Sequence, residues 1–410
     1  MKHRLPPALR LRAFALLWTS SLATGVASQM VAVAIGWQVY AIHRNPLDLG
    51  LVGLAEFVPL PLLALPAGQL ADRASRKVVA ATAGVIHVGI AGALLAITLS
   101  GQRALWPYLL VGGLAGVASA VGSPATRALT PELVPMELLQ GAIALRSVAS
   151  QIGVVAGPAL GGVIFAVDPT AVYAIALVLL VASVVAYVSL PPTVSRRGGE
   201  PLDWENLVAG VRFVVRTRML LGAILLDLFA VLLGDAIALA PVFARTILDV
   251  GPIGLGALRT APSVGALAAG ILIARRPLRR PAGPTLLVVV AVFGAATIVF
   301  GLSKSLPLSL AALAVTGFAD MISMNIRATT VAVITPLELQ GRVNAVEWVF
   351  ISASNELGAF EAGAVASLLG TVRAVVLGGS LMIAVAASWP RLFPALSRMG
   401  PLDELRTEPV

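Results

Sequence analysis

Nine charged residues lie inside otherwise apolar stretches of this 410-residue sequence, and their types suit the handling of protons or other cations. Seven are acidic and two are basic: Glu56, Arg146, Asp227, Asp235, Arg259, Asp320, Glu347, Glu356 and Glu361. A charged side chain in an apolar span is costly and by default indicates function. The formal charge of −5 favours a cation or a neutral amphiphile as the substrate.

Two of these acids are the strongest candidates for proton coupling. Asp235 and Glu356 lie nearest the middle of their apolar segments, at about half of a ~30 Å crossing with about 1.5 Å per residue. Asp320 is the third candidate. The alternative for any one of these acids is a structural pair with an arginine or a backbone group.

The other embedded charges have different expected roles. Glu56 and Arg259 both lie near the outer third of their segments, where we expect them to form an ion pair. Asp227 and Glu347 lie near the cytoplasmic end, and we expect them to be structural or gate residues.

The composition identifies a membrane protein. Charged residues make up 12% of the chain and hydrophobic residues 58%, whereas soluble domains carry about 25% charged residues. The mean hydropathy is +0.93. These values exclude a soluble enzyme, a disordered chain, a collagen and a coiled coil. The net charge of +9 is spread over short loop clusters, which indicates orientation in a membrane and not nucleic-acid binding.

Polar breaks divide the chain into apolar segments that are each long enough for one helical span of roughly 20 residues. We predict twelve, at 13–42, 48–70, 78–99, 105–127, 140–166, 170–190, 219–245, 252–274, 284–303, 307–328, 342–368 and 372–393. If the N-terminus is cytoplasmic, the outer side holds few basic residues, namely Arg44, Arg103, Arg245, Lys304 and Arg373. Because basic residues favour the cytoplasmic side, both termini are predicted to be cytoplasmic.

Other chemistry has little support. The chain has no cysteine and three histidines, and neither H-E-x-x-H nor G-x-x-x-x-G-K-[ST] occurs, so we expect no metal, no cofactor, no ATP-driven pumping and no enzymatic activity. His87 lies alone in the third segment, where we expect a neutral side chain that faces lipid or a neighbouring helix.

The two halves of the sequence repeat each other in their polar loops. Arg127-Ala128 recurs as Arg327-Ala328, and Pro135-x-Glu137-Leu138-Leu139-Gln140-Gly141 recurs as Pro336-x-Glu338-Leu339-Gln340-Gly341. These matches occur in the same order, about 200 residues apart, and indicate a duplication of six segments, which is an arrangement found in transporters.

The loop after the second segment carries a motif, Gly68-Gln69-Leu70-Ala71-Asp72-Arg73-Ala74-Ser75-Arg76-Lys77. It resembles the signature loop of the major facilitator superfamily, with Ser75 in place of the usual second glycine. Small residues let helices approach, Asp72 suits the positive end of the next helix, and the basic residues can pair with cytoplasmic carboxylates. We therefore predict a cytoplasmic gate made of Gly68, Leu70, Asp72, Arg73, Arg76 and Lys77. The alternative is a cluster of orientation charges with a chance aspartate.

The fifth segment ends in closely spaced glycines. Gly153-x-x-x-Gly157-Pro158-x-x-Gly161-Gly162 is similar to a motif of the antiporters in the same superfamily. Small residues allow close helix packing, and we expect Pro158 to bend the helix. A gating bend and ordinary packing glycine are both open interpretations.

Further residues resemble the enterobactin-exporter-like branch of the superfamily, which groups proton-linked drug and siderophore exporters. They are Trp37-Gln38-Val39-Tyr40, Pro46-Leu47, Gly210-x-Arg212-Phe213 and Gly341-Arg342-Val343-Asn344. The resemblance covers the whole chain and implies an all-α integral membrane fold with twelve transmembrane helices in two six-helix halves. It also implies that helices 1, 2, 4, 5, 7, 8, 10 and 11 line a cavity, and all nine embedded charges fall on these helices.

We predict a six-helix bundle over 1–190, a cytoplasmic linker with an amphipathic helix over 191–218, a second bundle over 219–393 and a cytoplasmic tail over 394–410. In the linker, apolar residues share one helical face beside Arg212 and Arg216, which suits an interfacial helix: Trp204, Leu207, Val208, Val211 and Val215. The alternative is an extension of the seventh span.

Together these observations predict a monomeric secondary transporter of the cell inner membrane that works by alternating access. Its expected partners are a small-molecule substrate, protons and the lipid bilayer, and not nucleic acid. The leading function is proton-coupled export of a small hydrophobic or cationic compound. A siderophore exporter is the alternative, which the acidic cavity disfavours because many siderophores are anionic. A non-transporting membrane protein, such as a sensor or an intramembrane enzyme, is the alternative from another class, and no catalytic constellation supports it.

Overall fold

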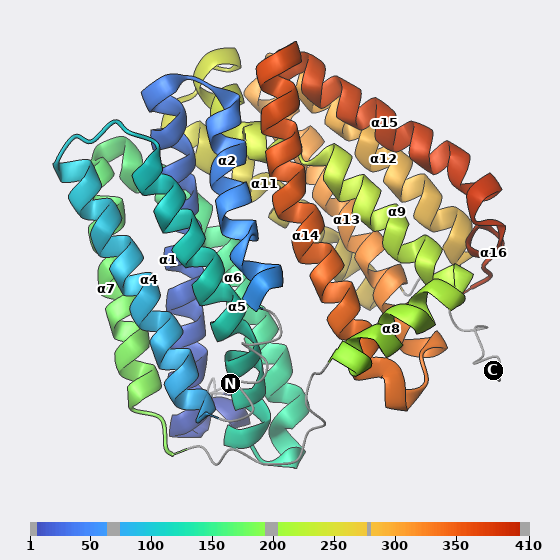
Figure 1. Cartoon of the computed structure of the whole chain (residues 1–410), viewed down its shortest axis with the longest axis horizontal. Helices are drawn as coiled ribbons and strands as arrows, with labels where there is room; N and C mark the ends of the chain where they lie inside the picture. Colours follow the sequence, from blue (N-terminus) through green and yellow to red (C-terminus); the bar gives the residue numbers. More distant parts are fainter. Residues whose placement is uncertain (1–5, 64–73, 193–203, 277–279, 402–410) are drawn as a thin grey trace. The chain divides into compact units, whose positions relative to one another are not determined.

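The computed structural model of the chain describes residues 6–63, 74–192, 204–276 and 280–401, and they form helices with no strand among them (Figure 1). Eleven helices within these residues are long and apolar enough to cross a membrane. A further long helix, α14 (Leu337–Leu369), has 33 residues, more than the roughly 20 that a span needs. It carries Glu347, Glu356 and Glu361, which lower its hydropathy. The predicted all-α fold and its number of long helices are confirmed.

The chain divides into two compact units. Unit 1 consists of Met1–His43, Ala55–Leu202 and Gly251–Thr260, and unit 2 consists of Arg44–Leu54, Asp203–Val250 and Ala261–Val410. Two short segments, 44–54 and 251–260, therefore pack with a different unit from the chain that follows them. Hydropathy does not indicate this exchange.

Unit 1 is built around a long first helix. Its elements are η1 (Pro7–Arg10), α1 (Arg12–His43), α4 (Arg76–Leu99), α5 (Trp106–Leu133), α6 (Met136–Val167) and α7 (Pro169–Val188), with the end of α2 (Pro46–Phe57) and the start of α11 (Gly251–Arg275). Helix α1 packs against α6 and α7, and α4 packs against α5 and α7. Tyr108, Tyr173 and Phe14 are fully buried among these helices.

Unit 2 packs its helices around α9, α12 and α14. Its elements are the start of α2, α8 (Trp204–Arg216), α9 (Arg218–Gly234), η2 (Ala236–Leu239), α10 (Ala240–Val242), η3 (Phe243–Ile247), the rest of α11, α12 (Ala282–Leu302), α13 (Leu306–Ile334), α14, α15 (Thr371–Leu392) and α16 (Pro394–Ser397). Helix α12 lies between α13 and α15, and α9 contacts α14 and α15.

The predicted span at 219–245 is not one continuous helix. Helix α9 ends at Gly234, Asp235 leaves the helical region with ψ of 62°, and a 3₁₀ turn, a short α-turn and a π-turn follow. Pro241 lies in this stretch and cannot donate a backbone hydrogen bond, and runs of this kind mark strained or functional positions. An acidic residue therefore lies at a backbone break within a span.

Helix α8 is separated from α9 at Thr217, whose φ of −90° and ψ of 88° are not helical. Phe213 and Val214 pack on a cluster that includes Val331 and Val343. The valines at positions 208, 211 and 215 are exposed on α8. The helix thus presents an apolar face outward beside the exposed Arg212 and Arg216.

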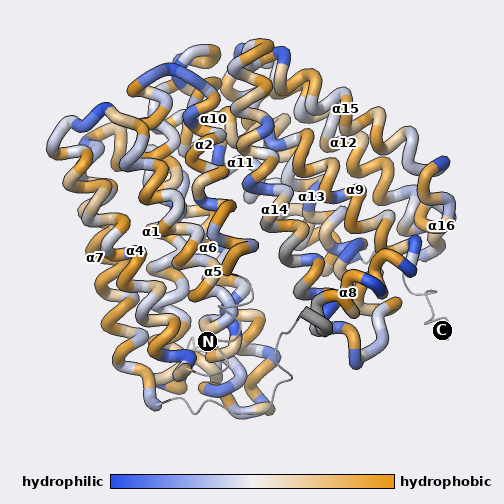
Figure 2. The backbone as a smooth tube through the Cα atoms, in the orientation of Figure 1, coloured by the Kyte–Doolittle hydropathy of each residue, from blue (hydrophilic) through white to orange (hydrophobic). Residues whose placement is uncertain are grey.

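Apolar side chains also cover the outer faces of the long helices. Figure 2 shows hydrophobic residues along the full length of the helices, with hydrophilic residues concentrated at helix ends and along α8. Leu110, Val178 and Val288 are 60%, 68% and 61% exposed. Exposed apolar surface on this scale fits contact with lipid.

The duplication is visible in backbone contacts inside each unit. In unit 1, a Cβ on Gly116 of α5 would lie 2.1 Å from the Glu56 carbonyl oxygen. In unit 2, a Cβ on Gly317 of α13 would lie 1.8 Å from the Pro262 carbonyl oxygen. The two glycines are separated along the chain by the same distance as Pro135 and Pro336, so the halves keep equivalent close contacts.

Candidate functional site

Unit 1 encloses a cavity of about 370 Å³ between α1, α4, α5, α6 and α7. Polar side chains supply much of its wall: Ser21, Thr24, Ser28, Gln29, His87, Ser119, Ser123, Thr126, Arg146, Ser150 and Tyr187. Among the described residues that line it, none is a carboxylate. The volume falls in the range of about 300–1,000 Å³ that is typical of small-molecule sites.

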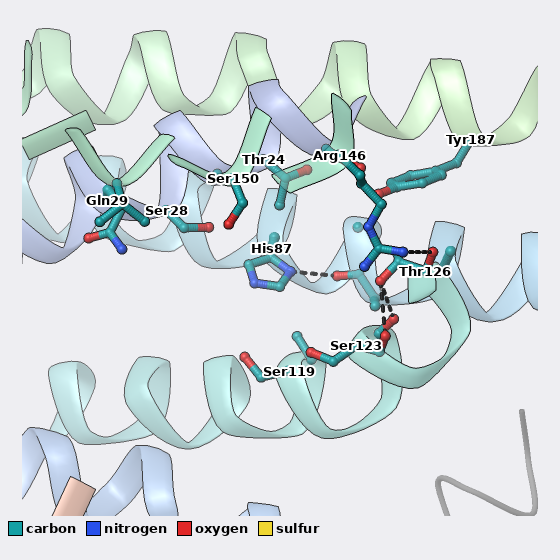
Figure 3. A pocket seen from close by; sticks show the side chains of 18 residues that line it. Thr24, Ser28, Gln29, His87, Ser119, Ser123, Thr126, Arg146, Ser150 and Tyr187 are labelled. Atoms are coloured by element: carbon teal, nitrogen blue, oxygen red, sulfur yellow. Dashed lines mark hydrogen bonds between the residues drawn. The ribbon is translucent and has the colours of Figure 1, made fainter. Parts of the chain in front are cut away.

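The hydroxyl groups converge because of their helical spacing. Residues three or four apart share one face of a helix, and two sets follow this spacing: Ser21, Thr24 and Ser28 on α1, and Ser119, Ser123 and Thr126 on α5. Figure 3 shows Thr24 and Ser28 on one side of the cavity and Ser119 and Ser123 on the other. This pattern was readable in the sequence, where only the charged residues were considered.

Arg146 of α6 is the cationic group of this cavity. Its Nη1 donates to the carbonyl oxygens of Thr126 at 3.1 Å and Arg127 at 3.2 Å, and to Thr130 Oγ1 at 3.1 Å. These three bonds hold the guanidinium plane at the end of α5 (Figure 3). In the described part of the chain, its other nitrogens make no hydrogen bond, so they can meet an anionic ligand.

His87 faces this cavity, and the expectation that it faces lipid or a neighbouring helix is wrong. Its Nδ1 lies 2.9 Å from the Ala83 carbonyl oxygen. Because a carbonyl oxygen only accepts, Nδ1 carries the proton, and Nε2 of the neutral ring is then an acceptor. The cavity thus offers an acceptor for a hydroxylated ligand as well as many donors.

Unit 2 brings two of the predicted coupling residues together. Asp235, at the break after α9, and Asp320 of α13 line one cavity of about 200 Å³ with Phe293, Thr316 and Asn355. The third predicted residue, Glu356, does not line it. A carboxyl oxygen of Glu356 would lie 3.6 Å from a Cβ on Gly53, in the segment of α2 that belongs to unit 2.

A buried ion pair lies beside Asp320. Arg327 Nη1 is 2.6 Å from Asp227 Oδ2, and the two side chains are 6% and 7% exposed. Asp320 and Glu347 interact electrostatically with this pair. This pairing was not predicted, because Arg327 lies near the end of an apolar segment and the two residues lie on different helices, α9 and α13.

The remaining embedded charges are placed as follows. Arg259 and Glu56 interact electrostatically inside unit 1, and their ion pair stays a prediction. Glu361 of α14 interacts with Asp235 and lines a second, smaller cavity with it.

Part of the predicted gate lies outside the described residues, namely Gly68, Leu70, Asp72 and Arg73. Arg76, at the start of α4, forms an ion pair with Glu132 of α5, and its Nη1 also donates to the Ala128 carbonyl oxygen at 3.4 Å. Lys77 donates to the carbonyl oxygen of Leu190. These bonds tie the start of α4 to the ends of α5 and α7.

The helix 5 motif makes backbone contacts along α6. A Cβ on Gly153, Gly157 or Gly161 would lie 3.0 Å or less from α1, and one on Gly162 would lie 2.5 Å from the Pro252 carbonyl oxygen of α11. Pro158 lies inside a helix that continues from Met136 to Val167. These contacts fit the interpretation that the glycines serve close helix packing.

A multi-pass helical protein whose units enclose a hydroxyl-lined cavity and an acidic one is built to hold solutes within a membrane, as a transporter does. The chain belongs to the transmembrane secretion effector family of the major facilitator superfamily, whose family model matches residues 5–403. Membership confirms the resemblance and the expectation that the protein is a transporter and not an enzyme.

Similar proteins include the enterobactin exporter EntS of Citrobacter koseri, 29% identical over 388 residues that cover 92% of this chain and 90% of that protein. The enterobactin exporter EntS of Escherichia coli O1:K1 is 28% identical over 382 residues, or 91% of this chain and 88% of that protein.

Solved structures share the fold. A bacterial homologue of the human lysosomal transporter Spinster has a TM-score of 0.74 at 15% identity, over 97% of this chain and 100% of that one. The nucleoside transporter NupG has a TM-score of 0.75 at 12% identity, over 93% and 100%.

Proposed function

We propose that the protein exports a hydroxylated anion of the siderophore class, bound in the cavity of unit 1. The observation that carries the proposal is the wall of that cavity, which combines Arg146 with many hydroxyl groups and has no carboxylate among its described lining residues. The sequence alone favoured a hydrophobic or cationic substrate over a siderophore, because the acids of both halves were assigned to one cavity. The proposal reverses that order.

The electrostatics of the cavity support an anion. Arg146 is held by neutral carbonyl and hydroxyl oxygens, and its charge is therefore not neutralised by an acid among them. A guanidinium can bind a carboxylate or catecholate oxygen with charge-assisted hydrogen bonds, which are about twice as strong as neutral ones. Asp235 and Asp320 line a cavity of unit 2 and are not among the residues that line this one.

The relatives also support this substrate class, since the curated relatives described above are named enterobactin exporters and cover about nine tenths of the chain. At 28–29% identity they do not fix the particular compound.

Binding to the purified protein tests the proposal, with enterobactin as the anionic probe and tetraphenylphosphonium as the cationic one. We expect Arg146→Met to weaken enterobactin binding about 10- to 100-fold, because a hydrogen bond to a charged group contributes about 1.5–3 kcal/mol. Arg127→Met is the matched control, since Arg127 is exposed at the end of the neighbouring helix and we expect unchanged affinity.

Equal enterobactin affinity in wild type and Arg146→Met would contradict the proposal. The second candidate function, export of a hydrophobic or cationic compound, is favoured by the cavity of Asp235, Asp320 and Phe293. It predicts tight tetraphenylphosphonium binding that Asp320→Asn weakens and Arg146→Met does not.

We further propose that protons drive export through Asp235, Asp320 and Glu356. Two of these line one cavity in unit 2, and acids near helix breaks bind coupling ions in other transporters. Proton-driven transport into inverted membrane vesicles is the measurement. Asp235→Asn and Glu356→Gln should each abolish it, and intact transport in both variants would show that the coupling residues are wrongly assigned.

We also propose an inner-membrane location with both termini cytoplasmic, which the basic-residue distribution and the bacterial exporter relatives support. Because the chain has no cysteine, a single cysteine added at either terminus can be tested for labelling by a membrane-impermeant reagent in intact and opened cells.

A further inference from the structure

A small cavity of about 10 Å³ lies where α9 breaks, next to the larger cavity of unit 2 that Asp320 lines, and the two share Asp235 and Thr297. Three oxygen-bearing side chains from three different elements line it: Asp235 after α9, Thr297 of α12 and Glu361 of α14. Its size is close to that of a single water molecule. A cavity of this size can hold one compact ion and no organic substrate.

Thr297 is the most unusual member of this group. The residue is 1% exposed, and its Oγ1 has no hydrogen-bond partner in the described part of the chain. Two other buried threonines of unit 2 are satisfied, since Thr316 Oγ1 donates to Leu313 at 2.7 Å and Thr330 Oγ1 donates to Ile326 at 2.8 Å. Thr335 Oγ1 also has no partner among the described residues, but Thr335 does not line this cavity. Leaving a buried hydroxyl unsatisfied is costly, which points to a ligand that it contacts.

The two carboxylates point to the charge of that ligand. Glu361 and Asp235 are close enough to repel each other, and a cation between them would relieve the repulsion. Helix α9 ends at Gly234 beside them, and the last carbonyl groups of a helix form the negative end of its dipole. Side-chain and backbone oxygens at this point therefore favour a cation.

Glycines enclose this helix end closely. A Cβ on Gly378 of α15 would lie 2.1 Å from the Leu233 carbonyl oxygen, and one on Gly358 of α14 would lie 3.0 Å from the Val231 carbonyl oxygen. The last turn of α9 is therefore fixed against two helices by backbone packing. A fixed break in a span, beside acidic groups, is the arrangement with which transporters coordinate coupling ions.

We propose that Asp235, Thr297 and Glu361 form a binding site for a compact monovalent cation, Na⁺. A proton on one carboxylate would also relieve the repulsion, but only a coordinated Na⁺ uses oxygen ligands from all three side chains at once. Because Asp235 is also a proposed proton carrier, Na⁺ and protons compete for it. The site deepens the cation half of the proposed function, and does not depend on which compound is exported.

Thermal unfolding of the purified full-length protein tests this site without any substrate. The probe is NaCl, compared with choline chloride at equal ionic strength and at two pH values. We expect a saturable rise of the unfolding midpoint in NaCl, since a ligand that binds only the folded state stabilises it. The rise should need more Na⁺ at the lower pH.

Variants then locate the site. Thr297→Val keeps the shape of the side chain and removes its oxygen. The NaCl concentration that gives half of the full rise in unfolding midpoint should therefore increase at least about tenfold. Thr297→Ser should restore the wild-type value, and Thr330→Val, which alters a buried threonine that lines neither cavity of unit 2 at Asp235, should retain it. Glu361→Gln should act like Thr297→Val.

Identical midpoints in NaCl and choline chloride for the wild type would overturn the proposal, as would a response to pH alone. Wild-type Na⁺ dependence in Thr297→Val would also overturn it. Each of these results leaves enterobactin binding by unit 1 intact, whereas a failure of the Arg146 experiment leaves the Na⁺ response intact, so the two proposals fail separately.

Discussion

The two units share an origin and differ in the charge of their cavities. Unit 1 surrounds its cavity with hydroxyl groups and Arg146, while unit 2 surrounds its own with Asp235 and Asp320. The repeated arginine shows the same divergence, since Arg127 is exposed and Arg327 is buried against Asp227. The duplicated scaffold was thus kept while the polar groups around the two cavities changed.

The largest difference in stability between the units should appear when the repeated arginine, Arg127 in unit 1 and Arg327 in unit 2, is replaced. Arg327→Met leaves Asp227 buried without its partner, and breaking such a pair costs about 3–5 kcal/mol. Arg127→Met alters an exposed side chain, for which about 0.5 kcal/mol or less is expected. Chemical unfolding of the purified variants gives both values.

The double variant Arg327→Met/Asp227→Leu is the control, because replacing both charges by apolar groups removes the uncompensated charge. It should be more stable than Arg327→Met alone. Equal losses for the two single arginine variants would show that the buried pair does not distinguish unit 2.

A smaller effect should be shared by the two units. Gly116→Ala and Gly317→Ala each place a methyl group against a backbone carbonyl, and overpacking of this kind costs about 1–3 kcal/mol. Gly141→Ala and Gly341→Ala are matched helical controls with nothing within 4 Å of the added carbon. These two control substitutions should raise the free energy of unfolding by up to about 1 kcal/mol. Sensitivity in one unit only would mean that the repeated contact is not equivalent.

The smallest difference concerns a helix start. Asp168 caps α7 by accepting from the Thr170 backbone amide at 2.8 Å, and its hydrogen bonds with Thr170 hold the carboxyl pKa below its ordinary value of 3.8. In unit 2, α15 starts after Gly370, which has a φ of 88° and no side chain to cap with.

Because the pKa of Asp168 is lower in the folded state, the ionised carboxylate stabilises the fold at pH values above its ordinary pKa. This stabilisation is lost as the pH falls through the folded-state pKa. We expect Asp168→Asn to flatten slightly the fall in unfolding temperature between about pH 5 and pH 3. An unchanged slope would show that this cap is not linked to acid stability.

Much of the fold was predictable because apolar length and glycine spacing are local signals. The spans, the repeat and the close contacts of Gly153, Gly157 and Gly161 follow from such patterns. The break at Asp235 within a predicted span was missed, since it arises from packing and from a run of non-α turns. The exchange of segments 44–54 and 251–260 between the units was also missed, because it too depends on packing.

The sites were predicted less well, because their signals are weak or depend on tertiary contacts. Charge in an apolar segment is conspicuous, so Asp235 and Asp320 were found. Hydroxyl groups are common in membrane helices and usually donate a hydrogen bond to a backbone carbonyl on the preceding turn. The hydroxyl groups around Arg146 and the unpaired hydroxyl of Thr297 were therefore not predicted as site residues. The partner of Arg327 and the inward position of His87 required the packed structure.

The contacts between Gly162 and Gly256 in unit 1 and between Gly363 and Gly50 in unit 2 join helices through backbone alone. Side chains that interlock lose rotamer freedom when a contact forms, and glycine has none to lose. Two helices held in this way can separate and rejoin with little reordering at that point. Larger side chains at these four positions would lose rotamer freedom each time the contact forms, a cost that glycine avoids.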